Sequence, residues 1–220
     1  MTNIKKNVKE ILDEIPDEVK LVAAAKTRTA DEIMAAIEAG VEIIGENYVQ
    51  ESLDVYQLVG DKAEWHFIGH LQRNKVKEVV PIYEMIESLD SKRLARKINK
   101  EAKKINKVQK VLIEINSGEE EQKFGILPED AIEFTKYVSN FGNLKVLGLM
   151  TMGPRFGEPE KSRPYFQKTK KIFDQLNGMG IDNIEMKYLS MGMTNSYKIA
   201  LEEGANIIRI GTKIFGKREK

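Results

Sequence analysis

Short apolar runs alternate with longer amphipathic stretches along most of this chain. Apolar runs of this kind, with few interruptions by polar residues, are typical of parallel β-strands that are buried on both faces. The stretches between them carry apolar residues at helical spacing and several end at glycine or proline, which favours helices. Strands are predicted at Val22–Ala25, Glu42–Gly45, Trp65–Gly69, Met85–Leu89, Val111–Ile115, Val146–Met150, Met186–Leu189 and Ile207–Ile210.

Helices are predicted after each of these strands. They cover Asp31–Ala39, Asn47–Leu58, Arg73–Val80, Lys92–Ile105, a stretch opened by Pro128, Pro164–Leu176, Thr194–Glu203 and a short one from Thr212, with a leading helix over residues 3–14. Repeated strand–helix units of this number predict an α/β fold of the (β/α)8, or TIM, barrel type. An open doubly wound sheet is the alternative, although the chain has no Gly-rich dinucleotide loop after its first strand. No linker divides the sequence, so we expect residues 1–220 to form a single domain.

Composition and charge narrow the function. The chain is 41% hydrophobic and 31% charged with a formal net charge of +1, which gives no electrostatic reason to expect a nucleic acid or a membrane surface as partner. Without a signal peptide or a long apolar span, we expect a cytoplasmic protein. The absence of cysteine excludes thiolate chemistry and Cys-ligated metals, and His66 and His70 lie in a strand-like run, so no metal site is expected.

Lys26 ends the first apolar run, at the mouth of the predicted barrel. Desolvation there would disfavour the ammonium, lower the pKa of Lys26 and free the amine to form a Schiff base. A solvated lysine just beyond a strand end is the simpler alternative.

Polar residues collect at the ends of the last two predicted strands. Ser190 follows the seventh strand, and Gly211 and Thr212 follow the eighth, where barrels recurrently bind phosphate through backbone N–H groups. Helix capping is the alternative explanation for each residue. Arg209 lies inside an apolar strand and needs a partner, either a neighbouring glutamate or the ring nitrogen of a ligand. A Schiff-base lysine, a phosphate cup and a charged group between them describe a site for pyridoxal 5′-phosphate.

The segments around these residues resemble the pyridoxal phosphate homeostasis protein family, single-domain relatives of the alanine racemase N-terminal barrel. The resemblance is carried by Val22–Thr27, Gly45–Glu51, Trp65–Lys75, Gly148–Met152, Leu189–Met193 and Ile208–Gly216. It implies pyridoxal 5′-phosphate as the cofactor, held as an internal aldimine on Lys26. It also implies that the remaining cofactor-binding residues are Asn47 near the cofactor, Ser190, Gly211 and Thr212 at the phosphate, Met191 beside them, and Arg209 facing the pyridine nitrogen. The family's usual aspartate after the Ser-Met segment is replaced by Asn195, which can still cap a helix.

The resemblance implies a carrier that holds and supplies the cofactor in vitamin B6 homeostasis, with apo-enzymes as recipients and a monomer or weak dimer as its state. Arginine stays protonated, so Arg209 can donate a hydrogen bond to the ring nitrogen but cannot supply the proton that strengthens the ring as an electron sink. The alanine racemase relatives also take a second base from a further domain, which this chain lacks. A weak amino-acid racemase that uses Lys26, alone or with Tyr48, is the first alternative. A Schiff-base aldolase with Asp90 or Glu46 as its acid or base is the second.

Overall fold

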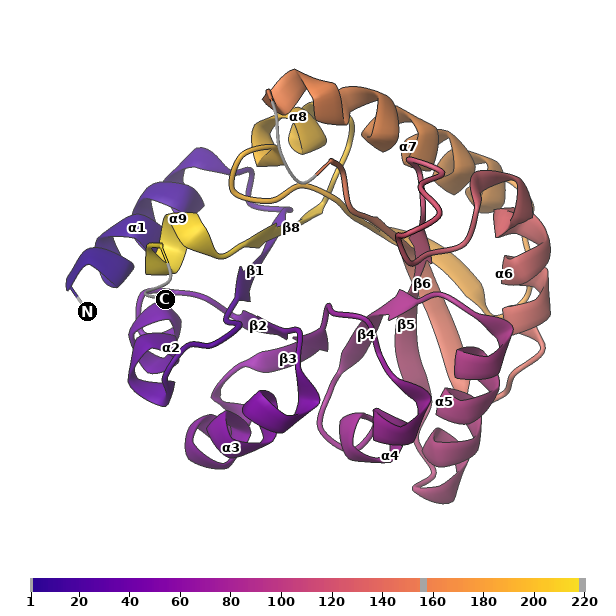
Figure 1. Cartoon of the computed structure of the whole chain (residues 1–220), viewed down its shortest axis with the longest axis horizontal. Helices are drawn as coiled ribbons and strands as arrows, with labels where there is room; N and C mark the ends of the chain where they lie inside the picture. The colour runs from indigo at the N-terminus through magenta and orange to yellow at the C-terminus, as the bar shows by residue number, and fades with distance from the viewer. Residues whose placement is uncertain (1, 155–157, 218–220) are drawn as a thin grey trace.

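The computed structural model describes residues 2–154 and 158–217. Within these residues, eight parallel strands pair in chain order and close into a barrel, with helices around the outside (Figure 1). Closure is made by β1 and β8, which pair from Lys20 opposite Ile207 to Ala23 opposite Ile210. The predicted barrel is confirmed, and the pairing of the first strand with the last excludes the open sheet.

The strands follow the predicted apolar runs. They are β1 (Lys20–Ala24), β2 (Ile43–Glu46), β3 (Glu64–Phe67), β4 (Met85–Leu89), β5 (Gln109–Ile115), β6 (Leu144–Thr151), β7 (Ile184–Ser190) and β8 (Ile207–Ile210). The strands β5, β6 and β7 begin earlier than predicted because charged residues extend them. Lys145 on β6 pairs with Glu185 on β7 at 2.8 Å, and Lys110 on β5 pairs with Glu84. Such pairs keep charged residues in a strand although they break its apolar run.

The helices alternate with the strands as predicted. They are α1 (Thr2–Glu14), α2 (Ala30–Ile37), α3 (Val49–Val59), α4 (Val76–Val79), α5 (Lys92–Lys104), α6 (Ala131–Ser139), α7 (Arg163–Asn177), α8 (Tyr197–Glu202) and α9 (Thr212–Phe215). The helix predicted over Arg73–Val80 is divided into a 3₁₀ turn at Arg73–Lys75 and the short α4. The helix predicted from Thr194 begins at Tyr197, because Met193 O accepts from the N–H groups of Ser196 and Tyr197 in a turn. The segment Gly153–Pro159, for which its glycine and proline residues predict a loop, lies partly outside the described residues.

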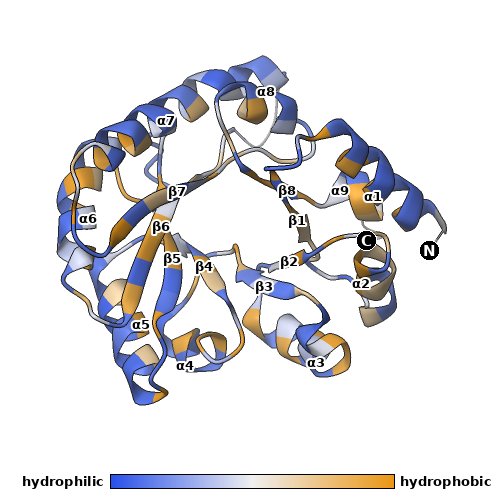
Figure 2. Ribbon diagram, turned by 180° about the vertical axis from the view of Figure 1, so that it is seen from behind, coloured by the Kyte–Doolittle hydropathy of each residue, from blue (hydrophilic) through white to orange (hydrophobic). Residues whose placement is uncertain are grey.

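Two apolar layers hold the barrel together. Alternate residues of each strand point into the barrel, where Val22, Ile43, Met85, Leu112 and Ile207 belong to one small cluster. The other strand residues pack against the inward faces of the helices, whose outer faces are hydrophilic (Figure 2). This alternation decides which strand residues can reach a site inside the barrel. Among the described residues, no helix is long and apolar enough to cross a membrane.

The N-terminal helix α1 lies beside α9, so the two ends of the described chain are neighbours (Figure 1). Asn7 Nδ2 donates to Ile214 O at 2.9 Å, and Lys213 Nζ donates to the Glu14 carboxylate at 3.0 Å. These contacts hold the start of α9 at the barrel mouth, beside the end of β1.

Candidate functional site

Lys26 lies just beyond β1 at the C-terminal mouth of the barrel, where it is half-buried. Its Nζ donates to the Tyr48 hydroxyl at 2.8 Å and lies 4.3 Å from the centre of the Tyr48 ring. The next residue, Thr27, has φ 64°, a left-handed conformation that is unusual for a β-branched residue. Arg28 N–H donates to Ala25 O at 2.8 Å and closes this turn. The strained turn therefore directs Lys26 across the mouth towards the start of α3.

Asn47 follows β2 and is positioned by close backbone packing. A Cβ on Gly69 would lie 2.5 Å from Asn47 O and 2.7 Å from Asn47 Cα, so only glycine fits after β3 at this point. Asn47 is half-buried and precedes Tyr48, the partner of Lys26. The loops after β1, β2 and β3 thus meet around Lys26.

The loops after β7 and β8 meet on the other side of Lys26. A Cβ on Gly211 would lie 3.1 Å from Ala24 O, which places the start of α9 against the end of β1. Thr212 is exposed there, and the Lys213 N–H donates to Thr194 Oγ1 at 3.4 Å. Gly192, with φ 88°, permits the turn between β7 and α8. The chain therefore brings Gly211 against Ala24, two residues before Lys26, with Thr212 next to it; the roles of both residues towards a cofactor stay predictions.

Ser190 and Met191 are placed differently from Thr212. Both side chains are fully buried, and the Met191 N–H donates to Ile207 O at 3.0 Å. The Ser190 hydroxyl points into the barrel, where it donates to Glu87 Oε2 at 2.6 Å and accepts a hydrogen bond from Arg209 Nη1. The Ser190 hydroxyl is thus engaged in a buried polar layer below the mouth, and its expected phosphate role stays a prediction. Asn195 is exposed, and it is the Ser196 hydroxyl that holds this loop by accepting from the Met193 N–H at 3.2 Å.

Arg209 is the centre of this buried polar layer, which also contains His66, Glu87 and Ser190. Its Nη2 donates to Thr151 O at 2.8 Å, and its Nη1 lies 3.8 Å from Glu87 Oε2. The arginine is 3% exposed and Glu87 is 0% exposed. The sequence left two kinds of partner open for Arg209, a neighbouring glutamate or the ring nitrogen of a ligand. In the structure its side-chain partners are a glutamate from β4 and a serine from β7. The guanidinium retains further N–H groups for a ligand.

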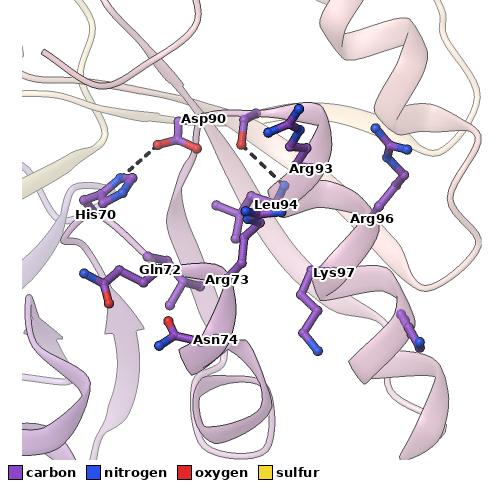
Figure 3. A pocket seen from close by; sticks show the side chains of 12 residues that line it. His70, Gln72, Arg73, Asn74, Asp90, Arg93, Leu94, Arg96 and Lys97 are labelled. Carbon is purple, nitrogen blue, oxygen red and sulfur yellow. Dashed lines mark hydrogen bonds and ion pairs between the residues drawn. The ribbon is translucent and has the colours of Figure 1, made fainter.

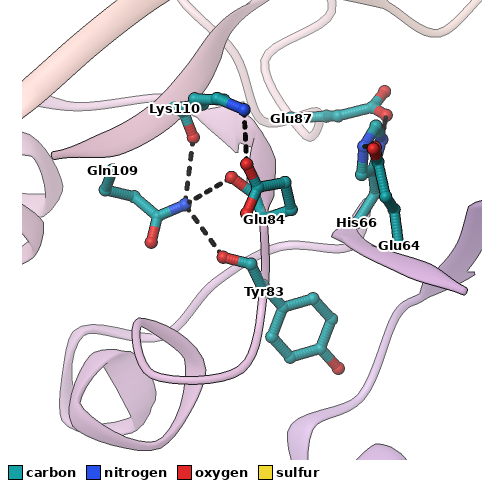
Figure 4. Close-up of polar contacts among 7 residues, drawn as sticks. All are labelled: Glu64, His66, Tyr83, Glu84, Glu87, Gln109 and Lys110. Atoms are coloured by element: carbon teal, nitrogen blue, oxygen red, sulfur yellow. Dashed lines mark hydrogen bonds and ion pairs between the residues drawn. The ribbon is translucent and has the colours of Figure 1, made fainter. Parts of the chain in front are cut away.

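His66 completes the layer from β3. Its Nδ1 lies 2.7 Å from Glu87 Oε1, and Glu64 lies on its other side, 3.8 Å from Nε2 (Figure 4). Burial favours the neutral imidazole, but the hydrogen bond with Glu87 and the negative charges of Glu64 and Glu87 outweigh it and raise the pKa of His66. Burial likewise opposes the ionised carboxyl, but His66 and Arg209 lower the pKa of Glu87. His66 and Glu87 therefore form a buried ion pair. Glu87 also holds Ser190 through a hydrogen bond and Arg209 through its charge.

Glu114 is a second carboxyl group in the barrel interior, and its pKa is raised where that of Glu87 is lowered. It lies on β5, two residues after the inward-facing Leu112, and is 7% exposed. Burial raises its pKa to about 7, the charge of Asp90 adds to this, and Arg209 acts against it. A carboxyl group that titrates near neutral pH can take up or release a proton under working conditions.

Two other sequence candidates do not join the site. Gly45 faces the interior, because its Cβ would meet Val22 and Ile68, so the next residue, Glu46, faces the helix layer. This orientation removes Glu46 as the acid or base of an aldolase. His70 is exposed on the loop after β3, stacks on Phe124 with 3.5 Å between ring centres, and pairs with Asp90 at 3.0 Å. The two histidines therefore have separate partners and do not face a common ligand.

Sequence reasoning missed His66, Glu87 and Glu114. The signal was the one that identified Arg209: each is an ionisable residue inside a predicted apolar strand. The sequence could not show which face of its strand each residue lies on. Glu46 also has apolar neighbours in its strand, yet its side chain faces the helices and not the barrel interior.

Comparisons with known proteins agree with this geometry. The alanine racemase N-terminal domain family model matches residues 1–219. A pyridoxal phosphate homeostasis protein from Aquifex aeolicus is 46% identical over 201 residues, 91% of this chain and 87% of that protein. A mouse protein of the same name is 37% identical over 213 residues, covering 91% of this chain and 77% of its own length.

Solved structures share the barrel. PipY of Synechococcus elongatus PCC7942, solved with pyridoxal phosphate bound, has a TM-score of 0.89 and 27% identity, over 97% of this chain and 100% of that one. An alanine racemase from Clostridium difficile 630 has a TM-score of 0.83 at 16% identity, over 100% of this chain and 58% of the enzyme, which shows the fold alone. The identity of 46% over 91% of the chain, together with the family model that matches residues 1–219, shows that the chain belongs to the pyridoxal phosphate homeostasis protein family.

Proposed function

We propose that this chain binds pyridoxal 5′-phosphate through Lys26 and holds it for supply to other proteins. The observation that carries the proposal is that Lys26, held by Tyr48, lies two residues beyond Ala24, on which Gly211 at the start of α9 packs. The relatives named for pyridoxal phosphate homeostasis and the PipY structure with pyridoxal phosphate bound support it. On this proposal residues 1–220 act as one cofactor-binding domain.

The donors at the mouth fit this cofactor group by group. Lys26 offers an amine for the aldehyde, and Tyr48 holds that amine by accepting its hydrogen bond at 2.8 Å. Gly211 approaches Ala24 so closely that a side chain there would press on β1, which leaves backbone and the Thr212 hydroxyl for a phosphate. Bound pyridoxal phosphate supplies a reactive aldehyde and an electron-withdrawing ring.

The chain's own residues favour holding over turnover. Arg209 is fixed by Ser190 and Thr151 and stays protonated, so it donates to a ring nitrogen without giving up its proton. The buried ion pair of His66 and Glu87 holds this arrangement rigid. Asn47 is placed by Gly69 at the edge of the mouth, where its amide can orient the ring. We extend the proposal to a cytoplasmic protein that delivers its cofactor to apo-enzymes as a monomer or weak dimer.

A weak amino-acid racemase is the second candidate function. Glu114 favours it, since a carboxyl with a pKa of about 7 on β5 is a proton donor and acceptor across the barrel from β1. Racemisation needs such a group opposite the lysine, together with Lys26 itself.

Borohydride reduction of the loaded protein followed by peptide mapping tests the proposal. We expect the pyridoxyl group on Lys26, loss of the bound-cofactor absorbance in Lys26→Ala, and normal loading of Lys20→Ala, which removes a lysine from the other end of β1. The loaded protein should reactivate an apo-aminotransferase while exchanging the α-proton of amino acids at background rate. Labelling of another lysine would overturn the assignment, and turnover lost in both Lys26→Ala and Glu114→Gln would establish the racemase instead.

A further inference from the structure

A cleft of about 1030 Å³ opens between α5 and the loop after β3 (Figure 3). Arg93, Arg96 and Lys97 extend from one side of α5, and the loop that carries His70 and Arg73 faces them (Figure 3). The cationic side chains that line the cleft are Arg73, Arg93, Arg96, Lys97 and Lys100. Asp90 is the one acidic residue among the described lining residues. We call these five cations and the space between them the basic cleft.

The charges of the basic cleft are not balanced within the described chain. Asp90 is engaged by His70 at 3.0 Å, and Lys97 pairs with Glu101 at 2.6 Å. Arg73, Arg93 and Lys100 make no ion pair with any described residue. Glu101 on α5 pairs with Lys97 and also with Lys104, and Glu78 on α4 pairs with Lys75. Arg73, Arg93 and Lys100 therefore present positive charge that no acidic side chain of the described residues pairs with.

The chemistry of the lining selects an anion with several oxygen atoms. Guanidinium groups bind phosphate oxygens in pairs, and the exposed amides of Gln72 and Asn74 add neutral donors at the same rim. The volume exceeds what a single phosphate fills and lies at the upper end of small-molecule sites. Cations on both walls of the cleft can each meet a separate phosphate group.

We propose that the basic cleft binds a small molecule that carries two or more phosphate groups, either a free polyphosphate or a nucleoside polyphosphate. This site is separate from the mouth around Lys26, because neither Lys26 nor Asn47 nor Thr212 is among the residues that line the cleft. The two are neighbours through Gly69, which packs on Asn47 and begins the loop that carries His70 and Arg73. The proposal does not depend on what Lys26 binds.

Titration calorimetry with sodium tripolyphosphate at low salt tests the site. We expect saturable binding to the wild-type chain, weakened about tenfold or more in Arg93→Ala/Arg96→Ala, because each lost charged hydrogen bond costs roughly that factor. The matched control is Lys103→Ala/Lys171→Ala, which removes one exposed lysine from α5 outside the cleft and one from α7. Circular dichroism checks that all variants fold.

Further arms of the experiment separate the possible outcomes. Borohydride-reduced holo-protein should bind tripolyphosphate as tightly as the apo form, provided that the labelled lysine is not Lys97 or Lys100 of the cleft. Equal affinity for tripolyphosphate and a nucleoside triphosphate would identify the phosphate chain as the whole ligand, and tighter binding of the nucleotide would add a contact to its base. Absence of saturable binding to the wild type, or equal weakening in the control, would overturn the proposal.

Discussion

The buried polar layer and the basic cleft handle charge in opposite ways. In the layer, Glu87 lies 2.7 Å from His66 and 3.8 Å from Arg209, and every charge has an opposite charge beside it. In the cleft, Arg73, Arg93 and Lys100 have no such partner among the described residues, yet all three lie at the surface. A buried unpaired charge costs several kcal/mol, whereas water and salt screen an exposed one. Pairing inside the barrel is thus required for folding, while unpaired cations in a cleft are free to serve a ligand.

Glu46 is a third case, a buried carboxyl without a cationic partner. It is 2% exposed, and its Oε2 makes no hydrogen bond with a described residue. Burial raises its pKa to about 7, the Asn47 N–H acts against this, and the charge of Glu51 adds to it. The fold thus favours the protonated form of this group below about pH 7 instead of giving it a cationic partner.

Removing Glu87 should have the largest effect on stability. Glu87→Ala leaves Arg209 and His66 buried without their counter-charge, and we expect a loss of about 3–5 kcal/mol in the free energy of unfolding. Urea denaturation at pH 7 measures this loss. Glu78→Ala, which breaks the half-exposed pair with Lys75, is the control and should cost under about 1 kcal/mol. A similar small cost for both variants would contradict the contrast between the two regions.

Replacing Glu46 should give a pH-dependent effect of intermediate size. The folded pKa is about 7 and the reference value is 4.5, so the folded state keeps a proton that the unfolded state loses. The contribution of Glu46 to stability is therefore present below pH 4.5, falls as the pH rises to about 7 and is constant above it. Glu46→Gln cannot ionise, so wild type should lose about 3 kcal/mol relative to this variant across that window. Urea denaturation of both proteins at pH 4.5 and pH 8 measures the change, and an unchanged difference would show that Glu46 is ionised when folded.

Removing one cation from the cleft should have the smallest effect on the apo protein. Arg93 is exposed and unpaired among the described residues, so Arg93→Ala should change the free energy of unfolding by under about 0.5 kcal/mol. With tripolyphosphate present, the wild type should gain thermal stability by mass action, and the variant should gain less. Thermal melts with and without the probe measure both values. A large loss of unfolding free energy in the apo variant would mean that Arg93 stabilises the fold, as the residues of the buried polar layer do.

Much of the fold could be predicted from the sequence because strand and helix periods are local. A strand buried on both faces reads as an apolar run wherever its neighbours lie, so all eight strands were found. The ends were less accurate, as at β7, where Glu185 and Lys187 interrupt the run but remain in the strand. The prediction that Lys26 lies on the same face as Gly211 and Thr212 rested on the barrel itself, since the C-terminal strand ends of a barrel share one face. Their roles toward the cofactor stay predictions.

The sequence by itself determined the order of strands and helices, the family and the lysine at the end of β1. Only the tertiary structure decided that Ser190 binds Glu87 and Arg209, because β4, β7 and β8 approach one another across the interior when the barrel closes. It also decided that Glu87 faces inward and Glu46 outward, although both are single carboxylates in apolar strands. The physical reason is that both faces of these strands are buried, so the local sequence pattern does not tell the inward face from the outward one. The partner of a buried charge is set by contacts between residues far apart in the chain.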